Sequence, residues 1–207
     1  MEIKARLGIL GSGKGSNMFA LAEACHQGVI RAEIAQVVSD VENAGILDRA
    51  KDFDIPATYL SPGPFRTKLD EDAEHNYIRL FREAKVDWIV LAGFMRMLKG
   101  DFLKAFPNRV INIHPSLLPS FPGLEAWKQA LEYGVKYTGC TVHFVDQGID
   151  TGAIILQETV PVMDDDTPQS LHARIQDAEH HLYPAAVGLA VEGRLEVRGR
   201  LCSKAAI

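Results

Sequence analysis

The sequence has little of several features that mark particular protein classes. It has only three cysteines, Cys25, Cys140 and Cys202, which are widely spaced and odd in number. This pattern contains no C-x-x-C motif and fits free thiols in a reducing cytoplasm. The longest uncharged, mostly apolar stretch covers only residues 182–191, whereas a membrane span needs roughly 20 residues. We therefore expect a cytoplasmic protein that makes no contact with a membrane.

Positive charge and metal-binding motifs are also scarce. There are 22 lysine and arginine residues against 27 acidic residues, which gives a net charge of −5. Because nucleic-acid-binding proteins are usually basic, we expect no nucleic-acid partner and a local site for any anionic ligand. His180 and His181 are adjacent, which is the wrong spacing for two ligands of one metal ion on a helix. No other cluster has convincing metal spacing, so we expect no metal.

The composition that remains is that of an ordinary globular protein. The chain has 207 residues, of which 47% are hydrophobic and 24% charged, and this suits one domain. Short apolar runs alternate with longer helical patterns, which is typical of an α/β fold. We expect strands at 7–10, 34–38, 57–60, 86–92, 110–113, 138–145, 153–162 and 193–197, and helices at 16–27, 44–53, 67–84, 124–133 and from about 168 to 189.

Two of these runs indicate how the strands pair. The run at 86–92 is almost entirely apolar, as in a central parallel strand that is covered on both faces. The short loop at 146–152 favours antiparallel pairing of the strands on either side of it. The sequence thus predicts a single α/β domain over residues 1–207, with a Rossmann-like, mostly parallel twisted sheet, helices on both faces and an antiparallel C-terminal section. The run at 193–197 is expected as a last edge strand.

A glycine-rich loop at 11–17, with the sequence GSGKGSN, follows the first strand and opens the first helix. Backbone N–H groups at a helix N-terminus form an anion site. The loop fails as a Walker A motif, because Gly15 replaces the hydroxyl residue that holds Mg²⁺ and Gly8 lies inside the strand. It fails as a dinucleotide fingerprint, because Ser16 replaces the third glycine. It suits one phosphate, with Gly15, Ser16 and Asn17 as donors and Ser16 as a possible N-cap, or else a turn without a ligand.

Polar side chains gather at the end of a strand. Asn112 and His114 are two residues apart, so they point to the same side of an extended chain. Open α/β sheets bind ligands at the carboxyl ends of their strands, and an amide with an imidazole could stabilise an oxygen that gains negative charge. Asp150 lies in a glycine-flanked loop, where it could shape a turn or orient His114 and accept a proton. For His143 a structural role is favoured.

Two further segments have a structural and a functional interpretation. Residues 93–98 follow the buried strand, and they either cover the core or form one wall of an apolar pocket for a flat heterocycle. Gln176 and Glu179 share one face of a helix, three residues apart, and we expect them to be solvated.

Taken in order, these motifs resemble one family. Gly13-Lys14-Gly15-Ser16-Asn17, Leu91-Ala92-Gly93-Phe94-Met95-Arg96, Asn112-Ile113-His114-Pro115-Ser116-Leu117-Leu118-Pro119, Pro122-Gly123 and Asp150-Thr151-Gly152 together resemble the phosphoribosylglycinamide formyltransferase family of purine synthesis. The resemblance runs from about residue 5 to 198. The Asn-x-His-Pro-Ser-Leu-Leu-Pro block is specific for enzymes that use 10-formyltetrahydrofolate, and the glycine-rich loop narrows the choice among them.

The resemblance implies a direct formyl transfer from the co-substrate 10-formyltetrahydrofolate to the amine of glycinamide ribonucleotide, without a metal. Asn112 and His114 would stabilise the oxyanion, while Asp150 would favour a charged His114 and help to move the proton. The ribonucleotide would be bound by Gly15, Ser16, Asn17, Gln176 and Glu179. The folate would be bound by Arg66, Met95, Arg96, Met97, Leu98, Asn112, Asp146 and Asp150.

The same resemblance carries three structural expectations. The N-terminal half would bind the phosphate and ribonucleotide, and the C-terminal half the folate. The Leu118–Pro119 peptide bond would be cis. The protein would be a monomer or a homodimer that acts on small molecules.

Four alternatives stay open. A methionyl-tRNA formyltransferase would carry a further C-terminal domain and lack the glycine-rich loop, and a formyltetrahydrofolate deformylase would carry an N-terminal regulatory domain. A sugar-nucleotide formyltransferase shares the Asn, His and Asp set, so the glycine-rich loop and the length argue against it. A non-catalytic nucleotide-binding module would explain the glycine-rich loop but not the other motifs.

Overall fold

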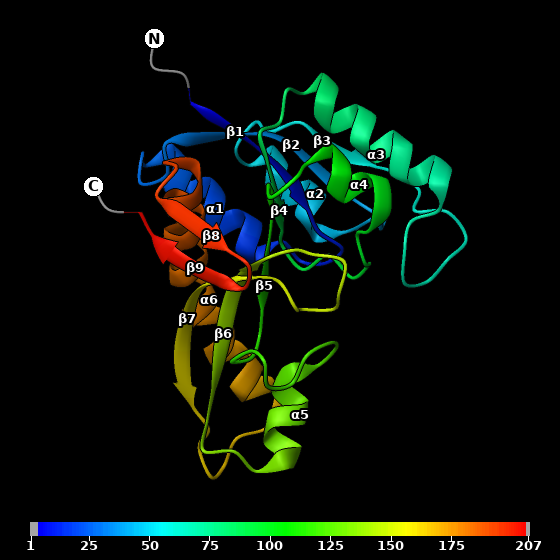
Figure 1. Cartoon of the computed structure of the whole chain (residues 1–207). Helices are drawn as coiled ribbons and strands as arrows, with labels where there is room; N and C mark the ends of the chain where they lie inside the picture. The colour runs from blue at the N-terminus through cyan, green and yellow to red at the C-terminus, as the bar shows by residue number, and fades with distance from the viewer. Residues whose placement is uncertain (1–3, 206–207) are drawn as a thin grey trace. The chain divides into compact units, whose positions relative to one another are not determined.

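The computed structural model describes residues 4–205 and shows an α/β fold (Figure 1). A seven-stranded sheet has the strand order β3-β2-β1-β4-β5-β6-β7, and a separate sheet contains β8 and β9. The chain divides into two compact units, Met1–Ile111 and Asn112–Ile207. Strand β5 (Val110–His114) crosses the boundary between the units. The predicted fold class, a mostly parallel sheet with helices and an antiparallel section near the C-terminus, is confirmed.

The first unit is built on parallel strands. β1 (Ala5–Leu10) pairs with both β2 (Ala32–Ser39) and β4 (Trp88–Leu91), and β2 also pairs with β3 (Ala57–Tyr59). Every residue of β4 is buried, as expected of a central strand. The helices of this unit are α1 (Ser16–His26), α2 (Gly45–Lys51), α3 (Glu71–Glu83) and α4 (Gly100–Ala105).

Gly8 shows why a glycine inside a strand need not belong to a ligand loop. A Cβ atom at this position of β1 would lie 2.6 Å from the ring of Phe81. Phe81 is fully buried on α3 and packs edge-on against Phe102 and Phe106. Gly8 therefore leaves room for an aromatic core, which agrees with the rejection of a Walker A motif.

The second unit contains antiparallel strands and the longest helix. β6 (Tyr137–Phe144) pairs with β7 (Ile154–Pro161) in antiparallel register, as predicted. The helices are α5 (Ala126–Tyr133) and α6 (Pro168–Val191), and α6 packs on β6 and β7. The Thr167 hydroxyl accepts from the Ser170 N–H and so caps α6. An ion pair between Asp166 and Arg174 ties the same turn, and it lowers the pKa of the Asp166 carboxyl well below its usual range.

Several predictions of helix and strand boundaries were wrong. The helix expected at 67–84 begins only at Glu71, because the Asp70 carboxylate accepts from the Ala73 N–H and caps the helix there. The N-cap of α1 is Gly15, with φ 77°, and not Ser16. The sequence did not indicate α4, which has six residues and is too short for a clear periodicity. The last expected strand became β8 (Leu195–Arg198), which pairs with β9 (Leu201–Lys204) and not with the seven-stranded sheet.

Candidate active site

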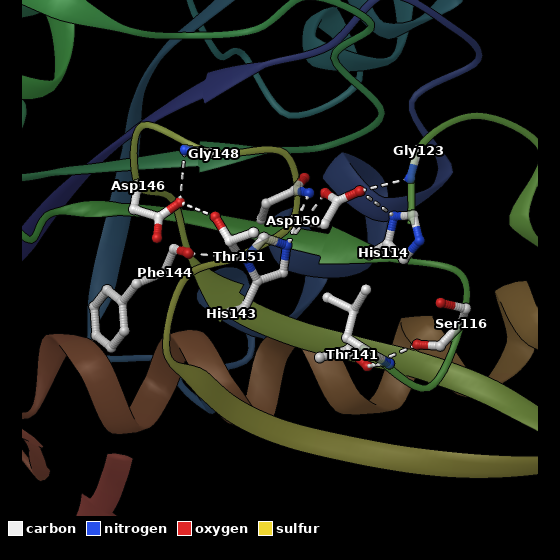
Figure 2. Close-up of polar contacts among 12 residues, drawn as sticks. His114, Ser116, Gly123, Thr141, His143, Phe144, Asp146, Gly148, Asp150 and Thr151 are labelled. Atoms are coloured by element: carbon white, nitrogen blue, oxygen red, sulfur yellow. Dashed lines mark hydrogen bonds and ion pairs between the residues drawn. The ribbon is translucent and has the colours of Figure 1, made fainter. Parts of the chain in front are cut away.

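Asp150 and His114 meet in the second unit. His114 is the last residue of β5 and Asp150 lies in the loop between β6 and β7. One carboxylate oxygen of Asp150, Oδ2, lies 3.4 Å from Nδ1 of His114 (Figure 2). The side chains are only 5% (His114) and 12% (Asp150) exposed. A positive charge on His114 would therefore face a carboxylate that water screens only weakly.

The backbone determines which nitrogen of His114 carries a hydrogen. Nε2 lies 2.9 Å from the carbonyl oxygen of Phe121. A carbonyl oxygen can only accept, so Nε2–H donates to Phe121. Nδ1 is consequently the nitrogen that faces the Asp150 carboxylate.

His143 orients Asn112, although the sequence favoured only a structural role for it. Nδ1 of His143 lies 2.8 Å from the carbonyl oxygen of Phe144, so Nδ1–H donates. Nε2 lies 3.2 Å from Nδ2 of Asn112, so it accepts from the amide. Burial lowers the pKa of His143 and so favours this neutral form. The opposite orientation of the Asn112 amide would need a doubly protonated His143, which burial disfavours.

This arrangement leaves the Asn112 amide ready to donate. An amide NH₂ group has two hydrogens, and His143 accepts only one of them. Asn112 is half-buried, and Nε2 of the same His143 lies 3.7 Å from Oδ1 of Asp150. Asn112, His114, His143 and Asp150 therefore form one cluster of polar side chains in the second unit, which can donate to an oxyanion and hold a proton.

The loop between β6 and β7 has a conformation that fixes Asp150. Asp150 has φ 53°, in the left-handed region, which aspartate tolerates better than most residues. A Cβ atom at Gly152 would lie 1.7 Å from the carbonyl oxygen of Phe144, so only glycine fits there. Oδ1 of Asp146 accepts from the Gly148 N–H at 3.0 Å and from the Thr151 hydroxyl at 2.6 Å (Figure 2). Asp146, a candidate folate ligand, thus holds the loop together.

The segment after His114 is held from both ends. The Gly123 N–H donates to Oδ2 of Asp150 at 2.8 Å. The Thr141 hydroxyl donates to the Ser116 carbonyl at 2.6 Å and accepts from the Leu118 N–H at 3.0 Å. The Leu118–Pro119 peptide bond is cis, as the family resemblance implied. These contacts hold the segment that contains Phe121, whose carbonyl oxygen accepts from Nε2–H of His114.

The glycine-rich loop, residues 11–17 of the first unit, joins β1 to α1. A Cβ atom at Gly11 would lie 2.7 Å from the carbonyl oxygen of Ala92, and one at Gly15 would lie 2.7 Å from the Cα atom of Ile46. Helix α1 begins without a side-chain cap, so its first N–H groups are not used by a capping side chain. An uncapped helix N-terminus is compatible with an anion site, and the assignment of Gly15, Ser16 and Asn17 to a phosphate stays a prediction.

Other candidate ligands of the first unit differ in exposure. Met95 and Arg66 are exposed, Arg96 and Met97 are half-buried, and Leu98 is buried. The Arg96 guanidinium forms an ion pair with Asp40, with Nε 2.6 Å from Oδ2. The sequence gave no indication of Asp40, because a lone aspartate after a strand is common in turns.

Gln176 and Glu179 lie on α6 in the second unit. Gln176 is half-buried, but Glu179 is only 5% exposed. The expectation that both are solvated was therefore wrong for Glu179. The buried positions of α6 include Ile175 and Ala178, so the Glu179 side chain falls on the helix face that packs inward.

Two absences concern the part of the chain that the structure describes. Among residues 4–205, no three His, Cys, Asp or Glu side chains are grouped so that they could hold a metal ion. In the same residues, none of the helices combines the length and apolarity that crossing a bilayer requires.

Comparison with known proteins identifies the class of this site. The family model described as formyl transferase matches residues 5–187, and the chain belongs to that family. The chain is 39% identical to phosphoribosylglycinamide formyltransferase of Haemophilus influenzae, over 95% of this chain and 92% of that protein. The crystal structure of glycinamide ribonucleotide transformylase 1 from Symbiobacterium toebii matches with a TM-score of 0.94 and 44% identity, over 100% of this chain and 96% of that one.

The chain also aligns with part of a longer relative. The chain is 45% identical to the trifunctional purine biosynthetic protein adenosine-3 of Drosophila melanogaster, over 92% of this chain. It spans only 14% of the length of that relative. The family predicted from the sequence motifs is confirmed.

Proposed function

We propose that this chain transfers the formyl group of 10-formyltetrahydrofolate to the amine of glycinamide ribonucleotide. The observation that carries the proposal is the cluster of Asn112, His114 and Asp150, which lies within a chain of the formyl transferase family. The relatives named above support the acceptor substrate, since their names refer to glycinamide ribonucleotide. Both substrates are small molecules, and the reaction needs no metal, membrane or nucleic acid.

The chemistry proceeds through a tetrahedral intermediate. The amine nitrogen forms a bond with the formyl carbon, and the formyl oxygen becomes an oxyanion. The second amide N–H of Asn112 and the positive charge of His114 stabilise that oxyanion. The bond between the formyl carbon and N10 of the folate then breaks. The proton lost by the amine reaches N10 with the help of the Asp150 carboxylate, so that the charges balance.

Binding roles follow the family motifs. We assign the ribonucleotide to Gly15, Ser16, Asn17, Gln176 and Glu179. We assign the folate to Arg66, Met95, Arg96, Met97, Leu98, Asn112, Asp146 and Asp150. We further propose one functional domain over residues 1–207, whose N-terminal half binds the phosphate and ribonucleotide and whose C-terminal half binds the folate. Gln176 and Glu179 for the ribonucleotide, and Arg66 and residues 95–98 for the folate, come from the opposite half. The protein would act in the cytoplasm as a monomer or homodimer.

The test is formyl transfer to glycinamide ribonucleotide by the purified protein. His114→Ala should lower kcat at least ~10²-fold while the fold survives, because well-placed charge stabilisation has about that effect. Asn17→Ala should raise the KM for the ribonucleotide far more than the KM for the folate. Release of formate without the ribonucleotide would instead indicate a deformylase, and near-normal turnover of His114→Ala would reject the role of His114.

A further inference from the structure

Asp40 connects two segments of the first unit to which we assign substrates, the glycine-rich loop and residues 93–98. The glycine-rich loop follows β1, and residues 93–98 follow β4. Asp40 directly follows β2. Its Oδ1 accepts from the Ser12 hydroxyl at 2.6 Å, and its Oδ2 accepts from Nε of Arg96 at 2.6 Å. Each oxygen of the Asp40 carboxylate is therefore bound to a different one of these two segments.

Ser12 completes the connection between the same segments. Its hydroxyl donates to Asp40 and accepts from the Met95 N–H at 3.0 Å. Its backbone N–H donates to the Gly93 carbonyl at 3.0 Å. Arg96 also donates from Nη1 to the Phe65 carbonyl in the loop that precedes α3. Ser12, Asp40 and Arg96, which we call the Asp40 bridge, thus hold three loops in one arrangement.

The bridge is poorly accessible to water. The Asp40 side chain is 3% exposed and the Arg96 side chain 15% exposed. Removing one partner of such a pair leaves the other charge buried and unpaired, which is strongly unfavourable. The mutual position of the two segments is therefore set by charge-assisted hydrogen bonds, which are short and directional.

The location of the bridge indicates a role beyond folding stability. A buried ion pair often contributes no more to stability than apolar residues of the same size would. This pair joins loops at the carboxyl ends of parallel strands, where open α/β sheets bind ligands. Both segments carry residues assigned above to substrates: Gly15, Ser16 and Asn17 to the ribonucleotide, and Met95, Arg96, Met97 and Leu98 to the folate.

We infer that Asp40 is a positioning residue for the formyl transfer, which holds the phosphate-binding and folate-binding segments in register so that each substrate finds its segment already ordered. The inference rests on the proposed function. The Asp40 carboxylate bonds to Ser12 and Arg96, and neither of these residues is assigned to the chemical step. Its loss should therefore weaken binding of both substrates more than it slows the chemical step.

The expected effects follow from the two bonds of the carboxylate. Asp40→Ala should raise the KM for both substrates by about 10- to 100-fold, because charged hydrogen bonds in buried sites have that range of effect. The change in kcat should be smaller. Asp40→Asn keeps the shape and one acceptor oxygen, so its KM values should lie between those of wild type and Asp40→Ala. Ser12→Ala should also raise both KM values, because it removes a link but leaves the ion pair.

A matched control is available in the second unit. Asp166 also forms an ion pair with an arginine, since its two oxygens each lie 2.8 Å from a nitrogen of Arg174. The Asp166 side chain is 2% exposed, and no substrate is assigned to it. Asp166→Asn should lower the melting temperature while both KM values stay within about twofold of wild type.

The experiment measures KM and kcat for both substrates, together with the melting temperature and amide hydrogen exchange. In Asp40→Asn, exchange should become faster in the loops that the bridge holds, which are 11–17, 93–98 and the loop around Phe65, and it should stay unchanged in the second unit. Unchanged KM values with a lower melting temperature, or an effect on one substrate only, would overturn the inference. A wild-type protein without formyl transfer would reject the proposed function instead, and hydrogen exchange would still decide whether the bridge holds both segments.

Discussion

Replacing Asp150 with asparagine tests the electrostatic part of the proposed mechanism. The change removes one negative charge and keeps the shape of the side chain. The asparagine oxygen can still accept from the Gly123 N–H that now donates to Oδ2. The loop that carries Asp150 should therefore persist, and the measured effect should report the charge.

The magnitude follows from the distance between the charges. Two unit charges 3.4 Å apart, the distance between His114 Nδ1 and Asp150 Oδ2, attract by roughly 1 kcal/mol in water and roughly 5 kcal/mol at an effective dielectric constant of about 20. Both side chains are nearly buried, so a loss of about 2–4 kcal/mol is expected for the charged intermediate. That loss corresponds to a decrease of about 30- to 1000-fold in kcat.

The assay is the rate of formyl transfer at saturating concentrations of both substrates. The control is Asp164→Asn, which removes a carboxylate that is 97% exposed and pairs with Lys136, and which should leave kcat within about twofold. If Asp150→Asn kept more than about a third of kcat while His114→Ala lost at least ~10²-fold, the attraction between the two charges would not be used in catalysis.

Three further predictions concern stability and reactivity. In a denaturant titration, Gly15→Ala should lower the free energy of unfolding by about 1–3 kcal/mol, because φ is 77° and an added Cβ would lie 2.7 Å from backbone. The control is Gly13→Ala, whose Cβ would meet nothing within 4 Å and which should change the free energy of unfolding by less than about 1 kcal/mol. Burial lowers the pKa of His143, so below about pH 6.5 the unfolded chain binds a proton at this residue more readily than the folded chain does. The free energy of unfolding should therefore fall as the pH drops below about 6.5, by at most about 1.4 kcal/mol per pH unit. His143→Gln should show a shallower fall, and equal slopes for the two proteins would contradict the assignment. Burial raises the pKa of Cys25 to about 11 and that of Cys140 to about 12, so a thiol reagent at about pH 8 should label both slowly in the folded protein and rapidly in urea.

Local patterns were sufficient to predict much of this protein. The apolar run around β4 predicted a buried parallel strand, because a strand covered on both faces has no polar side. The short loop after β6 predicted antiparallel pairing for a similarly local reason. Asn112 and His114 could be assigned to one side of a strand because side chains alternate with a period of two. The motifs around them indicated the family, which the comparisons confirmed.

Features that depend on distant parts of the chain were decided only by the tertiary structure. The sequence could not show that Asp150 lies beside His114, because 35 residues separate them in the chain and the left-handed conformation of Asp150 directs its carboxylate. It also could not show that His143 accepts from Asn112, because that contact joins residues of different strands. Asp40 was overlooked for the same reason, since its partners Ser12 and Arg96 lie 28 and 56 residues away. Residue type and spacing determine which chemistry is available, whereas the direction of each hydrogen bond depends on how strands and loops from separate segments pack.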